Sequence, residues 1–203
     1  VWTMLQLFIA VGIWFGFFLA VEHLGEQPLA VVNIIRSVSN ISFMMFSAFA
    51  TVTSSLVSNL IGAGHSDQVL KLIRRTAGLA FIGSGAFLVI FALFPNPILR
   101  IFTDSAVLID ATRETMYAIV INTMIQTGAY IVYNAVSGTG NTRVALLIEL
   151  IATVVYGVAI YIVVIVLRSS VALCWLCDST YALTIGLASF LYLWSGRWKN
   201  RRV

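Results

Sequence analysis

Residues 29–61 read LAVVNIIRSVSNISFMMFSAFATVTSSLVSNLI, an apolar run of 33 residues in which Arg36 is the one charged side chain. As an α-helix this run would be roughly 50 Å long, against about 30 Å of hydrocarbon in a bilayer. It therefore predicts a membrane-spanning helix that tilts, kinks or projects beyond the bilayer. The run is continuous and lacks the alternation of apolar and polar residues that is typical of strands in a membrane barrel.

The whole chain has the same character. Its 203 residues are 60% hydrophobic and 10% charged, with a mean hydropathy of +0.98, whereas a soluble domain carries about 25% charged residues. A large soluble catalytic domain is excluded, because several spans leave room for little else. The formal net charge of +4 does not indicate nucleic-acid binding, since the basic residues stand at the ends of apolar runs, where they set topology.

Six apolar runs predict six transmembrane helices. Their expected ranges are 2–21, 29–61, 76–94, 115–136, 144–167 and 171–194. We therefore expect an all-α integral membrane protein, with a six-helix transmembrane lobe over 1–194 and a basic cytoplasmic tail over 195–203. Between the second and third spans, residues 69–75 are amphipathic and predict a short separate helix along the inner membrane interface.

The basic residues divide unevenly between alternate loops. One set of loops holds eight of them: Lys71, Arg74, Arg75, Arg143, Arg197, Lys199, Arg201 and Arg202. The other set holds three: Arg100, Arg113 and Arg168. By the positive-inside rule, this bias places both termini and the loops 62–75 and 137–143 in the cytoplasm. The expected location is a plasma membrane, which in a prokaryote is the cytoplasmic membrane.

Two spans carry polar side chains along one helical face. In the second span these are Asn33, Arg36, Ser37, Asn40, Ser47, Thr51, Ser54 and Ser58. In the fourth span they are Asn122, Gln126, Tyr130 and Asn134. Small and amide residues can simply hold helices together. For the arginine and the amides taken together, a water-filled or substrate-lined face is the favoured interpretation, because polar groups in hydrocarbon are costly.

Two carboxylates lie within the spans. Glu149 is placed about 9 Å from the cytoplasmic end of its helix and Asp178 about 10 Å from the outer end. Both are candidate carriers of a coupling proton or ion. The alternatives are snorkelling to a nearby interface and a structural pair with Arg143 or Arg168. Similar depth on the outer side makes Asp178 the expected partner of Arg36, if the arginine has one.

No motif indicates an enzyme, a metal site or a bound cofactor. Cys174 and Cys177 match C-x-x-C, but no second pair accompanies them, and their spacing within one helix suits a disulfide poorly. They are interpreted as buried apolar cysteines. His23 and His65 fall on opposite sides of the membrane and cannot share a metal. No nucleotide-binding glycine loop is present.

Four motifs carry a resemblance to a known family. The run Ala30-Val-Val-Asn-Ile-Ile-Arg36, leading to Ser55-Leu-Val-Ser-Asn-Leu-Ile-Gly-Ala-Gly64, resembles the long second helix of a lobe in the multidrug and toxic compound extrusion (MATE) transporters. Phe94-Pro-Asn-Pro-Ile-Leu-Arg-Ile-Phe-Thr-Asp104 resembles that family's outer connection between the third and fourth helices. Ser137-Gly-Thr-Gly-Asn-Thr-Arg143 is similar to its inner Gly-x-Gly-(Asp/Asn)-Thr-Arg turn, and Ser195-Gly-Arg-Trp-Lys199 to its C-terminus.

The resemblance implies that the chain is the C-terminal lobe of a twelve-helix transporter, with an N-terminal six-helix lobe as its partner. Such transporters export organic, often cationic, compounds in exchange for Na+ or H+ and need no cofactor. The family's coupling carboxylates in this lobe lie in its first and fourth helices, which here contain no internal Asp or Glu. That departure favours a coupling site in the other lobe, and it leaves Glu149 and Asp178 as the candidates within this chain.

The residue pattern and the resemblance together predict a substrate cavity between the lobes. Its expected lining is Gln6, Trp14, Phe17, Phe18, Asn33, Arg36, Asn40, Met44, Asn122, Gln126 and Tyr130. Aromatic, methionine and amide groups suit a promiscuous site for small organic substrates, because they offer adaptable contacts. The alternative for the three aromatics of the first span is that they face lipid.

Two other functions stay open. A lipid-linked saccharide flippase of the same wider superfamily would share the bundle, but should show more buried basic residues for a pyrophosphate headgroup. A six-helix channel or receptor subunit should show a charged ring or a filter segment between its spans. Arg36 is the one basic residue within a span, and no filter segment is visible in the sequence.

Overall fold

The structure is a computed structural model that describes residues 2–22 and 25–198. Over these residues the chain is helical and contains no strand. The helices are α1 (Trp2–Glu22), α2 (Glu26–Gly62), α3 (Val69–Leu93), α4 (Pro95–Leu99), α5 (Ala106–Gly138), α6 (Thr142–Ile160) and α7 (Val171–Trp194). A 3-10 turn, η1 (Ser66–Gln68), precedes α3, and a π-helical segment, η2 (Tyr161–Val166), extends α6.

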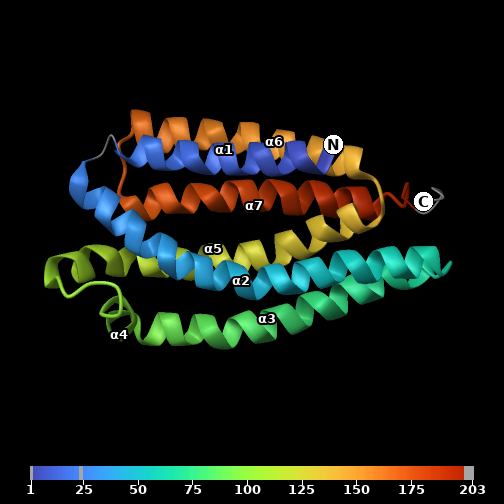
Figure 1. Ribbon diagram of the computed structural model, residues 1–203, viewed down its shortest axis with the longest axis horizontal. Helices are drawn as coiled ribbons and strands as arrows, with labels where there is room; N and C mark the ends of the chain where they lie inside the picture. The colour runs from blue at the N-terminus through green and yellow to red at the C-terminus, as the bar shows by residue number, and fades with distance from the viewer. Residues whose placement is uncertain (1, 23–24, 199–203) are drawn as a thin grey trace.

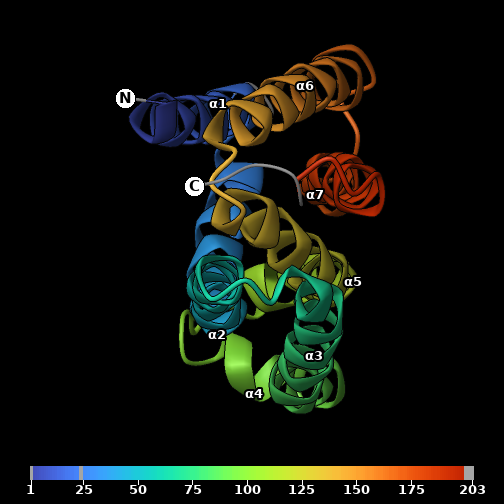
Figure 2. The same ribbon diagram turned by 90° about the vertical axis from the view of Figure 1, so that its right-hand side faces the viewer.

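The long helices lie side by side along the long axis of the molecule (Figure 1). Viewed end-on, α1 and α6 lie together at one side, α7 and α5 follow, and α2 and α3 occupy the opposite side (Figure 2). Helix α5 is the centre of this arrangement, because it packs against α2, α3, α6 and α7. Helices α2 and α7 both rest on α5 and scarcely touch each other. This position of α5 decides which polar side chains can meet.

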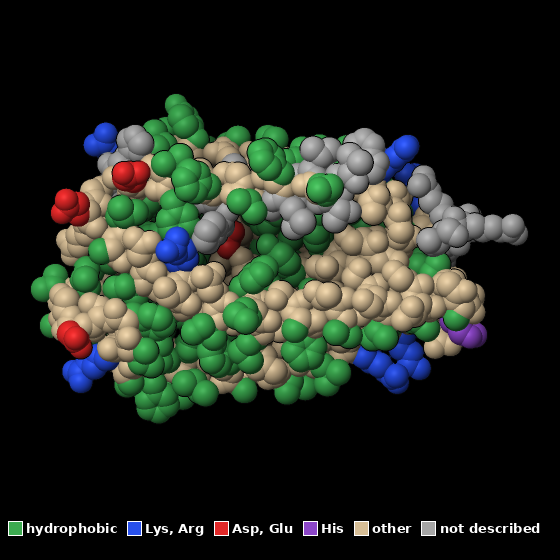
Figure 3. Space-filling view, viewed as in Figure 1, with side chains coloured by type: hydrophobic (Ala, Val, Ile, Leu, Met, Phe, Trp, Pro, Cys, Tyr) green, Lys and Arg blue, Asp and Glu red, His purple; other side chains and the backbone are tan. Residues whose placement is uncertain are grey.

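Five segments are long and apolar enough to cross a membrane: α2, η1 with α3, α5, α6 with η2, and α7. Helix α1 adds 21 residues in which Glu22 is the one charged side chain. Large apolar side chains point outward from every long helix, for example Met4, Met44, Ile82, Val154 and Trp194. In Figure 3 hydrophobic side chains spread over the body of the molecule, whereas most charged side chains on this face lie toward its two ends. An apolar belt between charged ends is the surface that a bilayer requires.

The helix that follows the first inner loop differs from the sequence prediction. Residues 69–75 are not a separate interface helix, because α3 begins at Val69 and continues unbroken into the third span. The physical reason is a continuous apolar stripe. Val69, Ile73, Thr76 and Ala80 recur at steps of three and four, and all four are buried in the bundle. By contrast, the range predicted for the last span agrees with α7, which runs from Val171 to Trp194.

Two glycines at one end of the bundle, Gly64 after α2 and Gly138 at the end of α5, are required by the fold. Gly64 adopts a φ of 79°, and the next amide, His65 N, bonds Leu60 O at 2.8 Å, which closes the end of α2. At Gly138 the backbones of α2 and α5 approach so closely that an added Cβ would stand 2.5 Å from Ser54 O. Ser58 Oγ donates a hydrogen bond to Gly138 O at 2.8 Å across the same crossing. Gly138 is therefore required by packing and Gly64 by its backbone conformation.

The loops with many basic residues lie at one end of the molecule. The α2–α3 connection, the α5–α6 connection and the end of α7 all lie at the right in Figure 1. The end of α1, the start of α2, the α6–α7 connection and α4 lie at the left. The exposed residues Glu26, Asp104, Asp110 and Glu114 belong to this second end. The two loop sets that the charge count separated are thus at opposite ends, while Lys199, Arg201 and Arg202 fall outside the described residues.

Candidate functional site

Asp178 is the centre of a polar cluster between α5 and α7. Asn122 Nδ2 donates a hydrogen bond to Asp178 Oδ2 at 3.0 Å, and Gln126 Nε2 donates to the same oxygen. Asn122 and Gln126 are four residues apart, so they lie one above the other on the face of α5 that meets α7. Ser179 Oγ donates to Asn122 Oδ1 at 2.9 Å. Because that hydroxyl occupies the oxygen of Asn122, the amide nitrogen is held toward the carboxylate.

This carboxylate has amides rather than a cation beside it. Among the described residues, its hydrogen-bond donors are Asn122 and Gln126, and no Lys or Arg pairs with it. A carboxylate within a membrane is costly unless it is protonated or accompanied by a cation. Asp178 itself is partly buried. The arrangement can therefore hold a proton or a small metal cation.

The expected pair between Arg36 and Asp178 is wrong. The guanidinium carbon of Arg36 lies 5.2 Å from the centre of the Phe18 ring, which is cation–π geometry. Equal depth in the membrane did not bring the two side chains together, because α5 lies between α2 and α7. Arg36 is half-buried and stays at the α1–α2 side of the bundle.

Glu149 forms a second polar cluster, at the junction of α5, α6 and α7. Its side chain is 3% exposed. Tyr181 OH donates a hydrogen bond to Glu149 Oε1 at 2.5 Å, and the Tyr133 hydroxyl bonds the same carboxylate. Tyr181 lies three residues after Asp178, on the same side of α7. One turn of α7 therefore links the two carboxylates, and phenols surround the second one where amides surround the first.

The polar face of α2 has a different environment. Asn33 and Asn40 are exposed, and Met44 is 72% exposed. Away from Ser58, hydroxyls on this face bond within their own helix, as Thr51 Oγ1 does by donating to Ser47 O at 2.9 Å. This face is open over the described part of the chain, and it is too polar to lie against lipid tails.

The aromatic residues predicted to line the cavity lie in different parts of the bundle. Phe17 is buried and packs edge-on against Trp175, with ring centres 5.6 Å apart, so it belongs to the core. Phe18 lies under Arg36. Tyr130 packs against Phe43 and Phe46 of α2 at 6.0 and 5.3 Å between ring centres. Gln6 and Trp14 are positions of α1 whose side chains lie outside the described part of the structure.

The predicted lining residues thus do not converge on one cavity. Asn33, Asn40 and Met44 line the open face of α2, whereas Asn122 and Gln126 turn inward to Asp178. Sequence reasoning did not single out Ser179 and Tyr181, which complete the two clusters. For Tyr181 the available signal was its spacing, since positions i and i+3 lie on the same side of a helix. The spacing of Ser179 carried no such signal, because its partner Asn122 is on another helix.

Comparison with known proteins decides the family. A family model described as MatE matches residues 3–168. This chain belongs to the MatE family. The predicted fold class is confirmed with it: the MatE chain is an all-α, multi-pass membrane protein shaped as one six-helix lobe of a MATE-like transporter.

Individual relatives agree with this assignment. A probable multidrug resistance protein NorM of Thermotoga maritima is 27% identical over 184 residues, which is 88% of this chain and 39% of the relative. A crystal structure of a MATE protein in a bent conformation matches with a TM-score of 0.84 at 15% identity, covering 97% of this chain and 44% of the other. The MATE transporter VcmN of Vibrio cholerae, also in a bent form, matches with a TM-score of 0.80 at 14% identity, over 95% of this chain and 45% of the other. The MatE chain therefore spans less than half the length of these proteins.

Proposed function

We propose that this MatE chain is the C-terminal lobe of a secondary antiporter that exports organic, often cationic, compounds in exchange for Na+ or H+. Membership of the MatE family and the likeness to a probable multidrug resistance protein support the reaction class. The observation that carries the proposal is Asp178, a carboxylate in a membrane helix that is held by two amides and has no basic partner among the described residues.

A second six-helix lobe is the proposed partner. The chain spans 39% of its NorM relative and 44% of a solved MATE chain, which leaves room in each for another unit of this size. The exposed polar face of α2 supports the same conclusion, because Asn33 and Asn40 need water or protein beside them rather than lipid. We place the substrate path along this face, with both termini in the cytoplasm and the protein in the plasma membrane.

Arg36 has an architectural role in this proposal. A guanidinium is a cation and would repel a cationic substrate. Its position over the Phe18 ring joins the outer halves of α1 and α2. In this proposal the substrate is contacted instead by Asn33, Asn40 and Met44, whose side chains can adapt to different compounds.

The coupling site is proposed at Asp178. Na+ prefers oxygen ligands, and the amides of Asn122 and Gln126 each offer an oxygen as well as an NH2 group. With the carboxylate charged, the NH2 groups face it, as in this structure. When a cation occupies the site, rotation of the amides would bring their oxygens toward it. Glu149, whose carboxylate accepts hydrogen bonds from phenols, is the second candidate.

Transport measurements on the intact two-lobe protein test this proposal. In proteoliposomes with an imposed Na+ or H+ gradient, Asp178→Asn should abolish gradient-driven ethidium movement while the protein still inserts and melts normally. The matched control is Asp110→Asn, which removes an exposed carboxylate from the outer end of α5, and it should transport like the wild type. Full gradient-driven transport by Asp178→Asn, or its loss only in Glu149→Gln, would refute Asp178 as the coupling site. Flux by the 203-residue chain alone would refute the two-lobe proposal.

A further inference from the structure

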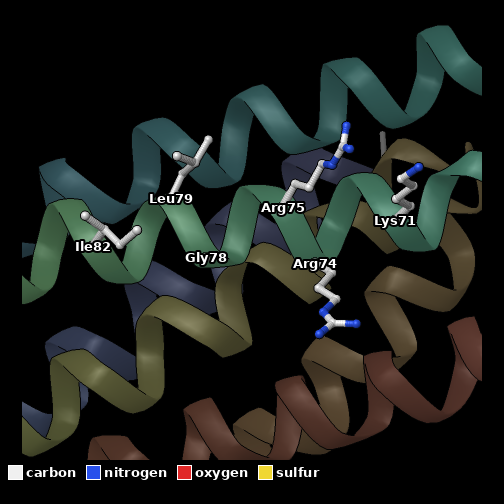
Figure 4. A pocket seen from close by; sticks show the side chains of 6 residues that line it. All are labelled: Lys71, Arg74, Arg75, Gly78, Leu79 and Ile82. Carbon is white, nitrogen blue, oxygen red and sulfur yellow. The ribbon is translucent and has the colours of Figure 1, made fainter.

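A groove lies along the first half of α3, at the end of the bundle that holds most of the basic loops. It has a volume of about 660 Å³ and is lined by Lys71, Arg74, Arg75, Gly78, Leu79 and Ile82 (Figure 4). None of these residues belongs to the Asp178 or Glu149 cluster. The groove therefore needs an explanation separate from transport.

The two halves of the groove differ in chemistry. Lys71, Arg74 and Arg75 are all exposed, and among the described residues none of them forms an ion pair. Figure 4 shows Lys71 and Arg75 extending to one side of α3 and Arg74 to the other. Asp67, in the turn before α3, is the nearest acidic residue along the chain. Three cations within five residues thus form a strongly positive end.

The other half is apolar and lies deeper along the helix. Leu79 is 60% exposed and Ile82 is 73% exposed. A Cβ added at Gly78 would meet nothing within 4 Å, so the missing side chain leaves open space between the cations and the apolar residues. From Arg75 to Ile82 the helix rises about 10 Å, which takes the groove from the membrane interface into the hydrocarbon.

We propose that this groove binds an anionic phospholipid. Lys71 and Arg75 hold the headgroup phosphate on one helical face, and Arg74, which extends to the other side of α3, adds positive charge at the same end. One acyl chain lies over Gly78 and along Leu79 and Ile82. Each half of the groove matches one half of the lipid: three cations match a phosphate, and exposed apolar side chains in the spanning part of α3 match an acyl chain.

Topology alone does not account for the groove. Basic residues that orient a membrane protein need only lie on the cytoplasmic side, without a shaped apolar neighbour. The open space at Gly78 is the feature that separates a lipid site from a topology signal. A side chain that fills this space, with all three cations kept, should therefore weaken lipid binding and leave orientation unchanged.

Native mass spectrometry of the intact protein in detergent tests the site, with phosphatidylglycerol and phosphatidylcholine as probes. The wild type should bind phosphatidylglycerol more tightly than phosphatidylcholine. The double variant Lys71→Gln/Arg75→Gln should weaken phosphatidylglycerol binding by about 25-fold, since each cation near a membrane surface contributes about fivefold. The charge-matched control Arg100→Gln/Arg113→Gln, at the other end of the bundle, should bind like the wild type.

The groove is tested separately with Gly78→Leu, whose matched control is Gly12→Leu on α1, away from the groove, where an added Cβ also meets nothing within 4 Å. Gly78→Leu should bind phosphatidylglycerol several-fold more weakly, and Gly12→Leu should bind it like the wild type. Inorganic phosphate at millimolar concentration should compete only weakly, because it lacks the acyl chain. Equal binding of the two lipids, wild-type affinity in Gly78→Leu, or complete displacement of phosphatidylglycerol by phosphate would overturn the proposal.

Discussion

The exposed face of α2 and the α5–α7 interface carry the same kinds of side chain at the same helical spacing, yet the fold uses them in opposite ways. On α2, Asn33 and Asn40 point out of the bundle. On α5, Asn122 and Gln126 point into it and bind Asp178 of α7. The difference lies in the neighbours: α5 is packed on several sides by other helices, whereas α2 covers one side of α5 and leaves its own outer face open.

The contrast between the polar faces of α2 and α5 shows how much helical periodicity in a sequence can establish. A repeat of three and four residues identifies a polar face, but it does not say what covers that face. Most hydroxyls on the face of α2 bond their own backbone, as Ser37 Oγ does to Asn33 O at 3.2 Å. Ser58, near the end of the helix, is the exception among the described residues, because its hydroxyl donates to Gly138 O of α5. The amides of α5 instead form hydrogen bonds between helices. Our proposal therefore puts a water-filled path along the first face and a site for the coupling ion at the second.

The largest expected effect is at Gly138, where α2 is held against α5. Gly138→Ala would place a Cβ 2.5 Å from Ser54 O, and the two backbones would have to move apart. We expect the free energy of unfolding to fall by about 2–3 kcal/mol, the usual cost of overpacking, with loss of the Ser58 hydrogen bond. Thermal unfolding in detergent measures the change. Gly62→Ala is the control, since a Cβ there meets nothing within 4 Å, and equal melting temperatures for the two variants would contradict the close crossing.

Cysteine accessibility separates the two polar regions directly. In the intact protein, with the buried Cys174 and Cys177 replaced by Ala, Asn40→Cys should react with a water-soluble maleimide. Asn122→Cys should be protected, because Asn122 is 3% exposed between α5 and α7. Labelling is read by mass spectrometry. If neither cysteine reacts in the native protein and both react after denaturation, the face of α2 meets lipid or protein, and the water-filled path is wrong.

The sequence was sufficient for the class of fold and insufficient for the contacts between helices. The apolar run from Val171 to Trp194 identified α7 to the residue, because interfacial tryptophan and polar loops bound it on either side. The stretch 69–75 was misjudged, since its lysine and arginines suggested an interface helix while its buried Val69 and Ile73 continue the core stripe of α3. The partner of Asp178 was also misjudged, because depth along a helix carries no information on which helix lies beside it.

A smaller effect is expected where an interhelical hydrogen bond is removed. Asn122→Leu takes one donor from Asp178 and leaves the Ser179 hydroxyl without its acceptor. We expect a loss of about 1–2 kcal/mol in the free energy of unfolding, since hydrogen bonds to a charged group are the stronger ones. Asn40→Leu on the open face of α2 should change it by less than about 0.5 kcal/mol. SDS titration measures both variants, and a double-mutant cycle of Asn122→Leu with Asp178→Leu should show non-additive losses. Additive losses would mean that the two side chains do not interact.

The smallest effect is expected at Thr51, and it is the most specific test of how the α2 face is built. Thr51 is exposed and its hydroxyl donates to Ser47 O of the same helix at 2.9 Å. Thr51→Val keeps the shape of the side chain and removes only this internal bond, so stability should change by less than about 0.5 kcal/mol. The matched control is Thr127→Val on α5, because the Thr127 hydroxyl is fully buried and lies 3.5 Å from Ser84 Oγ of α3. Thr127→Val should cost more than Thr51→Val, since the Ser84 hydroxyl then faces a methyl group inside the bundle. If Thr51→Val is the more damaging of the two, the Thr51 hydroxyl bonds to something beyond its own helix, and the open face is covered by the second lobe rather than by water.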